Sequence, residues 1–125
     1  MVDRIQWKPA PEDHDYPAAQ SFLELVVAPP LAARLVVALR VAPTVLWQSK
    51  DLLRASRLAA LDGDNPHVTK DLHKIKTGIA LSPVLLIRGD LERAMPLIVA
   101  DGYHRICAAH LVDENEAIHC RITDL

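Results

Sequence analysis

The chain of 125 residues is 50% hydrophobic and 24% charged, and its formal net charge at pH 7 is −2. A chain of this size and composition can bury one hydrophobic core, so we expect residues 1–125 to form a single domain. The slightly acidic balance excludes a general attraction for nucleic acid, and the apolar runs fall far short of the roughly 20 residues of a membrane span. No apolar signal core follows Met1, which predicts a cytoplasmic protein.

The nine prolines break the first half of the chain into short segments. Residues 1–16 lack a sustained period and are typical of an extended arm. Pro17 suits the first position of a helix that would end before Pro29-Pro30. We expect the apolar stripe of this helix to consist of Phe22, Leu25 and Val26.

A second helix is predicted from Pro30 to about Arg40, and the Pro-Pro break before it suggests a helical hairpin. Its leucines at intervals of four are Leu31, Leu35 and Leu39. A third helix-like segment extends from about Ser49 to Leu61. Its apolar residues are Leu52, Leu53 and Leu58. Residues 1–61 are therefore expected to be a helical N-terminal subregion.

The second half has clearer signals, beginning with a helix. Asn65 is a suitable N-cap, Pro66 fits the first helical position, and Gly78 stands where a left-handed C-cap is favoured. The expected buried face is Val68, Leu72 and Ile75. Both ends of this helix can thus be predicted from local chemistry.

Three strands and one helix are predicted after it. The apolar runs 84–87 and 97–100 are typical of strands covered on both faces, and residues 103–111 can form a helix directly after the second run. Residues 118–122 alternate between apolar and polar, which indicates a strand with one buried face. The prediction is an α/β (α+β) fold, a small mixed sheet with packed helices.

The turn between the 97–100 strand and the following helix carries the candidate site. The unpaired N–H groups at a helix start favour anions, and Gly102 would let the backbone approach a phosphate. Arg105 could offer a guanidinium fork and His104 could donate or accept a proton, while Tyr103 could stack on a base. Asp101 and His104 are the candidates for a catalytic role, and no metal ligand is assigned.

A purely structural interpretation stands beside this one. Asp101 is an ordinary N-cap residue, and Gly102 would only fit the turn. Arg105 would then pair with a nearby acid such as Glu114 or Glu116.

The order of parts from His67 to Thr123 resembles the ParB/sulfiredoxin superfamily, chiefly in Leu97–Ala109 around the Asp101–Arg105 turn. The resemblance covers about residues 64–125 and implies a ParB/sulfiredoxin-like α/β core. It also implies that Gly102, His104 and Arg105 contact nucleotide phosphates, with Tyr103 in the same nucleotide- or phosphate-binding site. The helix ending at Gly78 and the strand at Pro83 would form the other wall. The cofactor is not assigned, and a nucleoside phosphate with Mg²⁺ is the candidate.

The chain departs from each well-known activity of that superfamily. Tyr103 stands where sulfiredoxins carry their catalytic cysteine, which argues against sulfinic-acid reduction. Ile106 follows Arg105, whereas ParB proteins have a second arginine there. ParB proteins also carry a helix-turn-helix after this module and the sequence ends at Leu125, so direct DNA binding is not expected. A free-serine kinase shares the fold of the superfamily, so phosphoryl transfer to a small molecule remains a candidate activity.

We therefore expect a ParB-like nucleotide- or phosphate-compound-binding protein, with weak nucleotide hydrolysis or phosphoryl transfer as the activity open to it. The alternative is a non-catalytic protein-interaction module that keeps the fold and forms a homodimer through its N-terminal helices. This alternative rests on the high apolar content of the N-terminal helices, namely Leu31, Leu35, Val36, Val37 and Leu39. A DNA-acting nuclease ranks third because of the acidic balance.

Several other groups have ordinary explanations. Cys107 and Cys120 are expected to be buried thiols, and Trp7 and Trp47 to be core or interface anchors. The acids of 113–116, with Asp51 and Asp64, are expected to be solvated. The dipeptide His14-Asp15 is also expected to be solvated; the alternative interpretation is that it closes over the site. The basic residues Lys70, His73, Lys74 and Lys76 are expected to form a solvent-exposed helix face.

Overall fold

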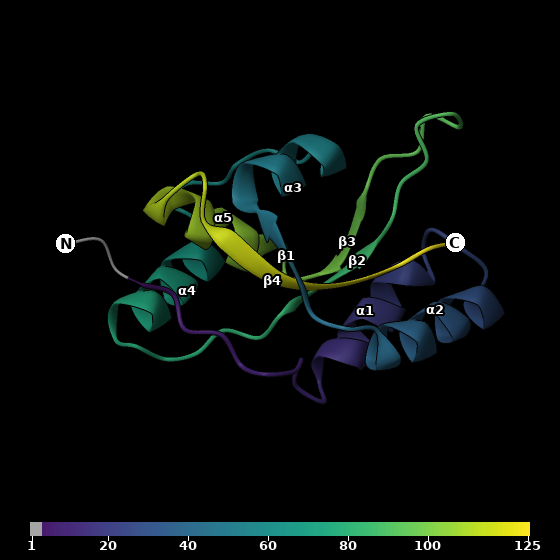
Figure 1. Cartoon of the computed structure of the whole chain (residues 1–125), viewed down its shortest axis with the longest axis horizontal. Helices are drawn as coiled ribbons and strands as arrows, with labels where there is room; N and C mark the ends of the chain where they lie inside the picture. The colour runs from purple at the N-terminus through teal and green to yellow at the C-terminus, as the bar shows by residue number, and fades with distance from the viewer. Residues whose placement is uncertain (1–3) are drawn as a thin grey trace.

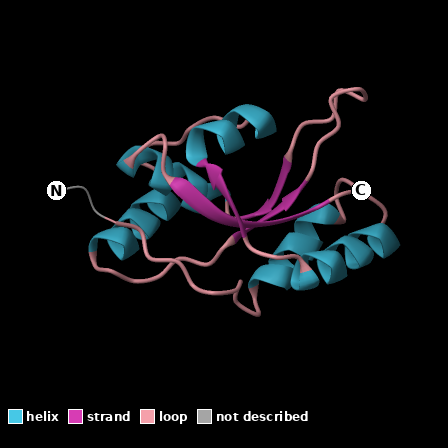
Figure 2. Cartoon of the chain, viewed as in Figure 1, coloured by secondary structure: helices cyan, strands magenta, loops and turns pink. Residues whose placement is uncertain are grey.

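The computed structural model describes residues 4–125 and builds them into five helices and a four-stranded mixed sheet, which confirms the predicted α/β class. The helices are α1 (Asp15–Leu23), α2 (Pro29–Val41), α3 (Ser49–Ser56), α4 (Pro66–Lys76) and α5 (Tyr103–Val112). The strands are β1 (Val45–Gln48), β2 (Val84–Ile87), β3 (Ile98–Asp101) and β4 (Ala117–Thr123). Figures 1 and 2 show the sheet between two groups of helices, with α1 and α2 on one side and α3, α4 and α5 on the other.

The sheet has the order β1-β4-β2-β3. β4 pairs in parallel with β2 and antiparallel with β1, and β2 forms an antiparallel hairpin with β3. β2 therefore lies inside the sheet, and all four of its residues are buried, as its apolar run predicts. β3 was expected to be covered on both faces as well, but only Ala100 of its residues is buried, because β3 is an edge strand.

Two hydrophobic cores occupy the two faces of the sheet. Val84 and Leu86 of β2 point into the core formed with α3, α4 and α5. Leu85 and Ile87 alternate with them and point into the core formed with α1 and α2. The apolar content of the N-terminal helices is thus used to cover the second face of the sheet.

The first helix differs from the sequence prediction. It begins at Asp15 rather than Pro17, and its buried apolar residues are Tyr16, Ala19 and Leu23. The residues that were expected to be buried, Phe22, Leu25 and Val26, are 40%, 84% and 51% exposed. The helix ends at Leu23, so the last two lie in the turn before α2 and have no core to face.

The second helix agrees with the prediction, and α1 and α2 pack together as the expected helical hairpin. Leu35, Val36 and Leu39 of α2 are buried against the sheet, whereas Val37 is 62% exposed. Most of the apolar residues that motivated a dimer interface therefore have an internal partner already.

β1 was not predicted, and it adds a strand to a subregion expected to be wholly helical. Val45 is half-buried and the other three residues are exposed, so β1 is defined by pairing with β4 rather than by its own pattern. The helix that follows, α3, ends at Ser56 instead of Leu61, because Arg57 adopts a left-handed conformation with φ 61°. Leu58 consequently lies outside the helix and is 39% exposed.

The α4 prediction is confirmed at both ends of the helix, and Val68 and Ile75 are buried as expected, while Leu72 is half-buried. The Asn65 side chain accepts hydrogen bonds from the N–H groups of His67 and Val68, and Gly78 follows the helix with φ 75°. Both cysteines are buried and unpaired, as predicted. In residues 4–125 no helix has the length and apolarity to cross a bilayer.

The N-terminal arm is extended as expected, apart from residues 1–3, which lie outside the described residues. It is held against the chain just before β2, where the Lys8 N–H donates to the Leu81 carbonyl and the Leu81 N–H donates to the Gln6 carbonyl, each at 2.8 Å. This pairing carries residues 12–15 past the start of α5.

Candidate functional site

A polar cavity of about 380 Å³ lies where the arm, α4 and the start of α5 meet. It contains all four residues that the sequence assigned to phosphate binding, Gly102, Tyr103, His104 and Arg105, together with Asp101. Its other charged or titratable residues are Lys8, Glu12, His14, Asp15, His67, Lys70, Asp71 and Lys74. The cavity thus joins the predicted turn to α4, the helix expected at the other wall, and to the arm, whose closure over the site was the alternative interpretation of His14-Asp15.

Gly102 occupies a position that only glycine fits. Its φ is 108°, and a Cβ there would overlap Val84 Cγ1 and lie 2.7 Å from Arg105 Nη2. Gly102 is the N-cap of α5 and has no side chain to bond the first amides of the helix. The helix therefore begins with N–H groups that lack a side-chain cap, which favours a negatively charged group in front of them.

Asp101 is not the N-cap that the structural interpretation made it. It ends β3, and its carboxylate accepts a hydrogen bond from Arg105 Nη2 at 2.7 Å. Burial raises the pKa of Asp101, the Arg105 charge opposes this rise, and the nearby Asp15 carboxylate adds to it. Asp101 is therefore engaged with Arg105 before any ligand arrives.

Arg105 is also close to Asp15, whose carboxylate oxygen lies 3.7 Å from Nη1. The Arg105 side chain is only 13% exposed, so most of its guanidinium faces protein. The structural interpretation was correct that Arg105 pairs with acids, but the partners are not Glu114 or Glu116. The expected free fork for phosphate is absent in this arrangement, and Arg105 instead holds two carboxylates together.

Asp15 contradicts the expectation of a solvated His14-Asp15 dipeptide. It is 3% exposed, and its carboxylate also accepts a hydrogen bond from the Glu12 N–H at 2.9 Å. The first turn of α1 packs against β3, which carries the side chain inward to Arg105. The arm therefore closes over the site at this residue, while the His14 side chain stays 76% exposed.

The cations that remain for a ligand come from α4. Lys70 and Lys74 line the cavity, and neither has an acid within 4.0 Å among the described residues. Lys8 differs, since it forms an ion pair with Glu12. The helix face expected to be merely exposed to solvent thus supplies two unneutralised ammonium groups to the site.

Two histidine rings lie next to each other at the cavity, those of His67 and His104, with centroids 4.7 Å apart. Burial lowers the pKa of His104, and the charge of His67 lowers it further. Burial raises the pKa of Asp71 on the same helix as His67, against the opposing charges of Lys74 and Arg105. A neutral His104 can accept a proton near pH 7.

Tyr103 is held by a hydrogen bond rather than left open for stacking. Its hydroxyl donates to the carbonyl of Ala59, in the segment that follows α3. Burial raises the pKa of this hydroxyl, which favours the neutral donor form. Tyr103 therefore ties the start of α5 to residues 57–61.

One group of potential metal ligands occurs among residues 4–125, formed by Glu12, His14 and Asp15, whose ligand atoms lie within 4.8 Å of one another. Glu12 is paired with Lys8, and Asp15 lies beside Arg105. A cation would compete with both, so the group is a poor resident metal site.

The helix α4 was expected at the other wall of the site, but the entry of four of its side chains into the cavity was not predicted, although their spacing was a signal. His67, Lys70, Asp71 and Lys74 are spaced by three and four residues, which places them on one face of α4. The burial of Asp15 had no comparable signal, because its partner lies at the far end of the chain. The other carboxylates considered, Asp51, Asp64 and the acids of 113–116, do not line the cavity.

The chain was compared with protein-family models, curated proteins and solved structures, and none of them matches it.

Proposed function

We propose that this protein binds a nucleotide or another phosphate compound in the cavity between the arm, α4 and α5. The observation that carries the proposal is the meeting of the uncapped start of α5 at Gly102 with the ammonium groups of Lys70 and Lys74. Backbone amides and lysine are both favoured partners of phosphate oxygens. The cavity volume of about 380 Å³ is within the range of small-molecule sites.

The proposal changes the role of Arg105. With Asp101 and Asp15 as partners, Arg105 positions the arm and the turn and offers at most a side contact to the ligand. The phosphate contacts pass to Lys70, Lys74 and the first amides of α5. This arrangement is consistent with a ParB/sulfiredoxin-like fold, since the chain places a glycine turn between β3 and α5 at one wall of the cavity.

A weak hydrolase or phosphoryl-transfer activity would depend on His104. Of the two catalytic candidates, Asp101 is engaged by Arg105, whereas the pKa of His104 is lowered and the ring lines the cavity. Mg²⁺ carried in with the nucleotide would offset repulsion between its phosphates and the cavity carboxylates. His104 would then accept the proton of the attacking water.

The direct test is thermal unfolding with a panel of nucleoside mono-, di- and triphosphates, with and without Mg²⁺. A ligand present at about a hundred times its Kd adds about 2.7 kcal/mol to the free energy of unfolding. We expect at least one nucleotide to raise the melting temperature of the wild type. The double variant Lys70→Gln/Lys74→Gln should lose the shift, and Lys76→Gln on the same helix should keep it.

The opposite outcome is equally clear. If no nucleotide at millimolar concentration changes the melting temperature, the cavity is not a nucleotide site. The same holds if the Lys70→Gln/Lys74→Gln variant responds as strongly as Lys76→Gln.

An interaction module that dimerises through its N-terminal helices is the second proposal. The apolar residues left outside on α2 are Val37 and Val41, which are 62% and 81% exposed. Leu35→Asp would not test it, because Leu35 is buried against the sheet and the variant would unfold. Val37→Asp is the informative change. Light scattering should show a dimer that this change converts to a monomer, and a wild-type monomer at all concentrations would refute the proposal.

A further inference from the structure

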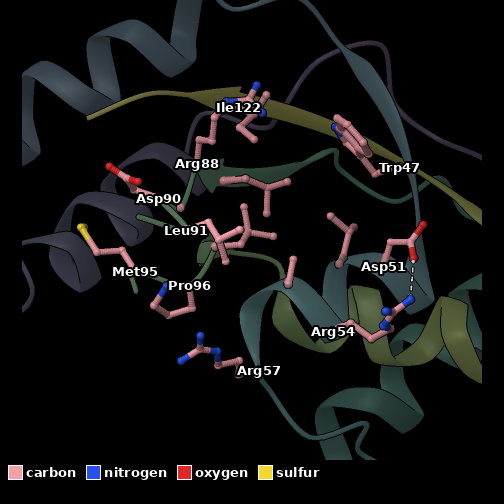
Figure 3. Close-up of a pocket in the computed structure, with 15 residues that line it drawn as sticks. Trp47, Asp51, Arg54, Arg57, Arg88, Asp90, Leu91, Met95, Pro96 and Ile122 are labelled. Carbon is pink, nitrogen blue, oxygen red and sulfur yellow. Dashed lines mark ion pairs between the residues drawn. The ribbon is translucent and has the colours of Figure 1, made fainter. Parts of the chain in front are cut away.

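A second cavity, of about 430 Å³, lies between α3 and the β2–β3 hairpin, away from the polar site. Its floor is apolar and includes Leu52, Leu86, Leu97 and Ile122. Figure 3 shows Trp47 at one end of the cavity and Met95 and Pro96 of the hairpin at the other. Such walls leave apolar surface accessible to solvent, which an apolar ligand would cover.

The charged groups at the rim differ in whether they are neutralised. Arg54 lies 3.7 Å from the carboxylate of Asp51, the dashed pair in Figure 3, and Arg88 pairs with Asp124 at 2.7 Å. Arg57 lines the same cavity, and no acid lies within 4.0 Å of it among the described residues. Among the described residues, Arg57 is therefore the one cation at the rim without an acid within 4.0 Å.

Arg57 is held in a backbone conformation that its residue type rarely adopts. Its φ is 61° and its ψ is 23°, and it ends α3 as the left-handed C-cap. Glycine is the usual residue in this role, so arginine here carries strain that glycine would not. Strained residues in folded proteins cluster at ligand sites, and this one lines an apolar cavity.

We propose that this cavity binds a small amphipathic carboxylate, with its apolar body against Leu86, Ile122 and Trp47 and its carboxylate paired with Arg57. The volume suits a small organic molecule, and one cation that is unpaired among residues 4–125 suits a single negative charge. An arginine–carboxylate pair at the edge of an apolar pocket fixes orientation, while the burial of apolar surface supplies most of the affinity. The site is independent of the phosphate cavity, which has different residues and a polar lining.

Trp47 can report on the site. The chain has two tryptophans, and Trp7 does not line this cavity. Trp7→Phe retains an aromatic ring against His119, on which Trp7 stacks, and leaves Trp47 as the only indole. Titration of this variant with decanoate should give a saturable change in Trp47 fluorescence. Decylamine, which has the same chain and the opposite charge, should bind at least about tenfold more weakly.

Three changes in the Trp7→Phe background distinguish binding of decanoate at this cavity from nonspecific binding elsewhere on the protein. Arg57→Gly removes the guanidinium and relieves the backbone strain, so it should weaken decanoate binding about tenfold without lowering the melting temperature. Arg57→Lys keeps the charge and should retain most of the affinity. Arg34→Gln removes an exposed arginine on α2 and should change nothing.

Filling the cavity gives a further check. Ala55 lines it and is exposed, so Ala55→Trp can occupy the space without disturbing the core. Decanoate should then fail to bind. The proposal is overturned if decanoate gives no saturable change at millimolar concentration, or if Arg57→Gly and Ala55→Trp bind it as tightly as their parent. It is also overturned if decylamine binds as tightly as decanoate, or if the wild type proves to be a dimer that Ala55→Trp makes monomeric.

Discussion

The carboxylate of Asp15 lies 3.7 Å from the guanidinium of Arg105, although Asp15 begins the first helix and Arg105 belongs to the last. Arg105 also binds Asp101 at 2.7 Å, so a single cation stands between two acids that are largely buried. This contact joins the start of α1 to the glycine turn, and all three residues line the polar cavity.

Removing the cation should cost more than removing one acid. Arg105→Gln leaves Asp15 and Asp101 as unpaired carboxylates, and we expect it to lower the free energy of unfolding by about 3–5 kcal/mol. Asp15→Asn keeps an acceptor for the Glu12 amide and leaves the Arg105–Asp101 pair intact, so its cost should be about 1–2 kcal/mol. Urea denaturation of the two variants measures both. If both variants lose the same small amount of free energy of unfolding, the ion pairs of Arg105 do not stabilise the fold.

The three glycines Gly63, Gly78 and Gly102 form a graded series. A Cβ at Gly63 meets nothing within 4 Å, so Gly63→Ala should be neutral or stabilising by up to about 1 kcal/mol. Gly78 has open space but φ 75°, and Gly78→Ala should cost about 1 kcal/mol. Gly102→Ala adds a collision with Val84 to the strain and should cost about 2–4 kcal/mol. The melting temperatures of the three variants should fall in the order Gly63→Ala, Gly78→Ala, Gly102→Ala. An unchanged melting temperature for Gly102→Ala would contradict the described geometry of the turn at Gly102.

His104 should make stability depend on pH. Burial lowers the pKa of His104 below 6.5, the usual value for histidine, so the ring binds a proton more readily in the unfolded chain than in the folded one. The stabilising contribution of neutral His104 is present above about pH 6.5 and is lost as the pH falls toward the lowered pKa. His104→Gln should therefore reduce the fall in melting temperature between neutral and mildly acidic pH. NMR titration of the ring checks the direction, and a pKa above 6.5 would refute it.

The two thiols should be unreactive in the folded protein. Burial raises the pKa of Cys120 to about 12 and also raises that of Cys107, which reduces the thiolate fraction near pH 8. Neither side chain is exposed. Ellman's reagent should label them slowly in native protein and rapidly after unfolding. Fast labelling of either cysteine in native protein would show that its surroundings open readily.

The elements predicted best from the sequence are those with local chemical signals. Asn65, Pro66 and Gly78 define α4 without reference to the rest of the chain, and the apolar run 84–87 defines the buried strand β2. β1 has no such signal, because Val45–Gln48 is partly exposed and becomes a strand only by pairing with β4.

The candidate site shows the same division. The glycine turn at Gly102 follows from the order of a strand, a glycine and a helix, and the structure brings the four predicted residues to one cavity. The engagement of Arg105 by Asp15 could not be predicted, because it depends on how the first helix packs against β3. The pairing of Arg105 with acids follows from that packing, and it is the reason why the proposed phosphate contacts fall to Lys70 and Lys74.

Amide chemical shifts of ¹⁵N-labelled protein during titration with a Mg²⁺–nucleoside triphosphate test the phosphate site most directly. We predict saturable shifts that are largest at Gly102–Arg105 and along Lys70–Lys74, and that are lost in the Lys70→Gln/Lys74→Gln variant. An unchanged spectrum at millimolar nucleotide, or shifts confined to α3 and the β2–β3 hairpin, would contradict the proposed site.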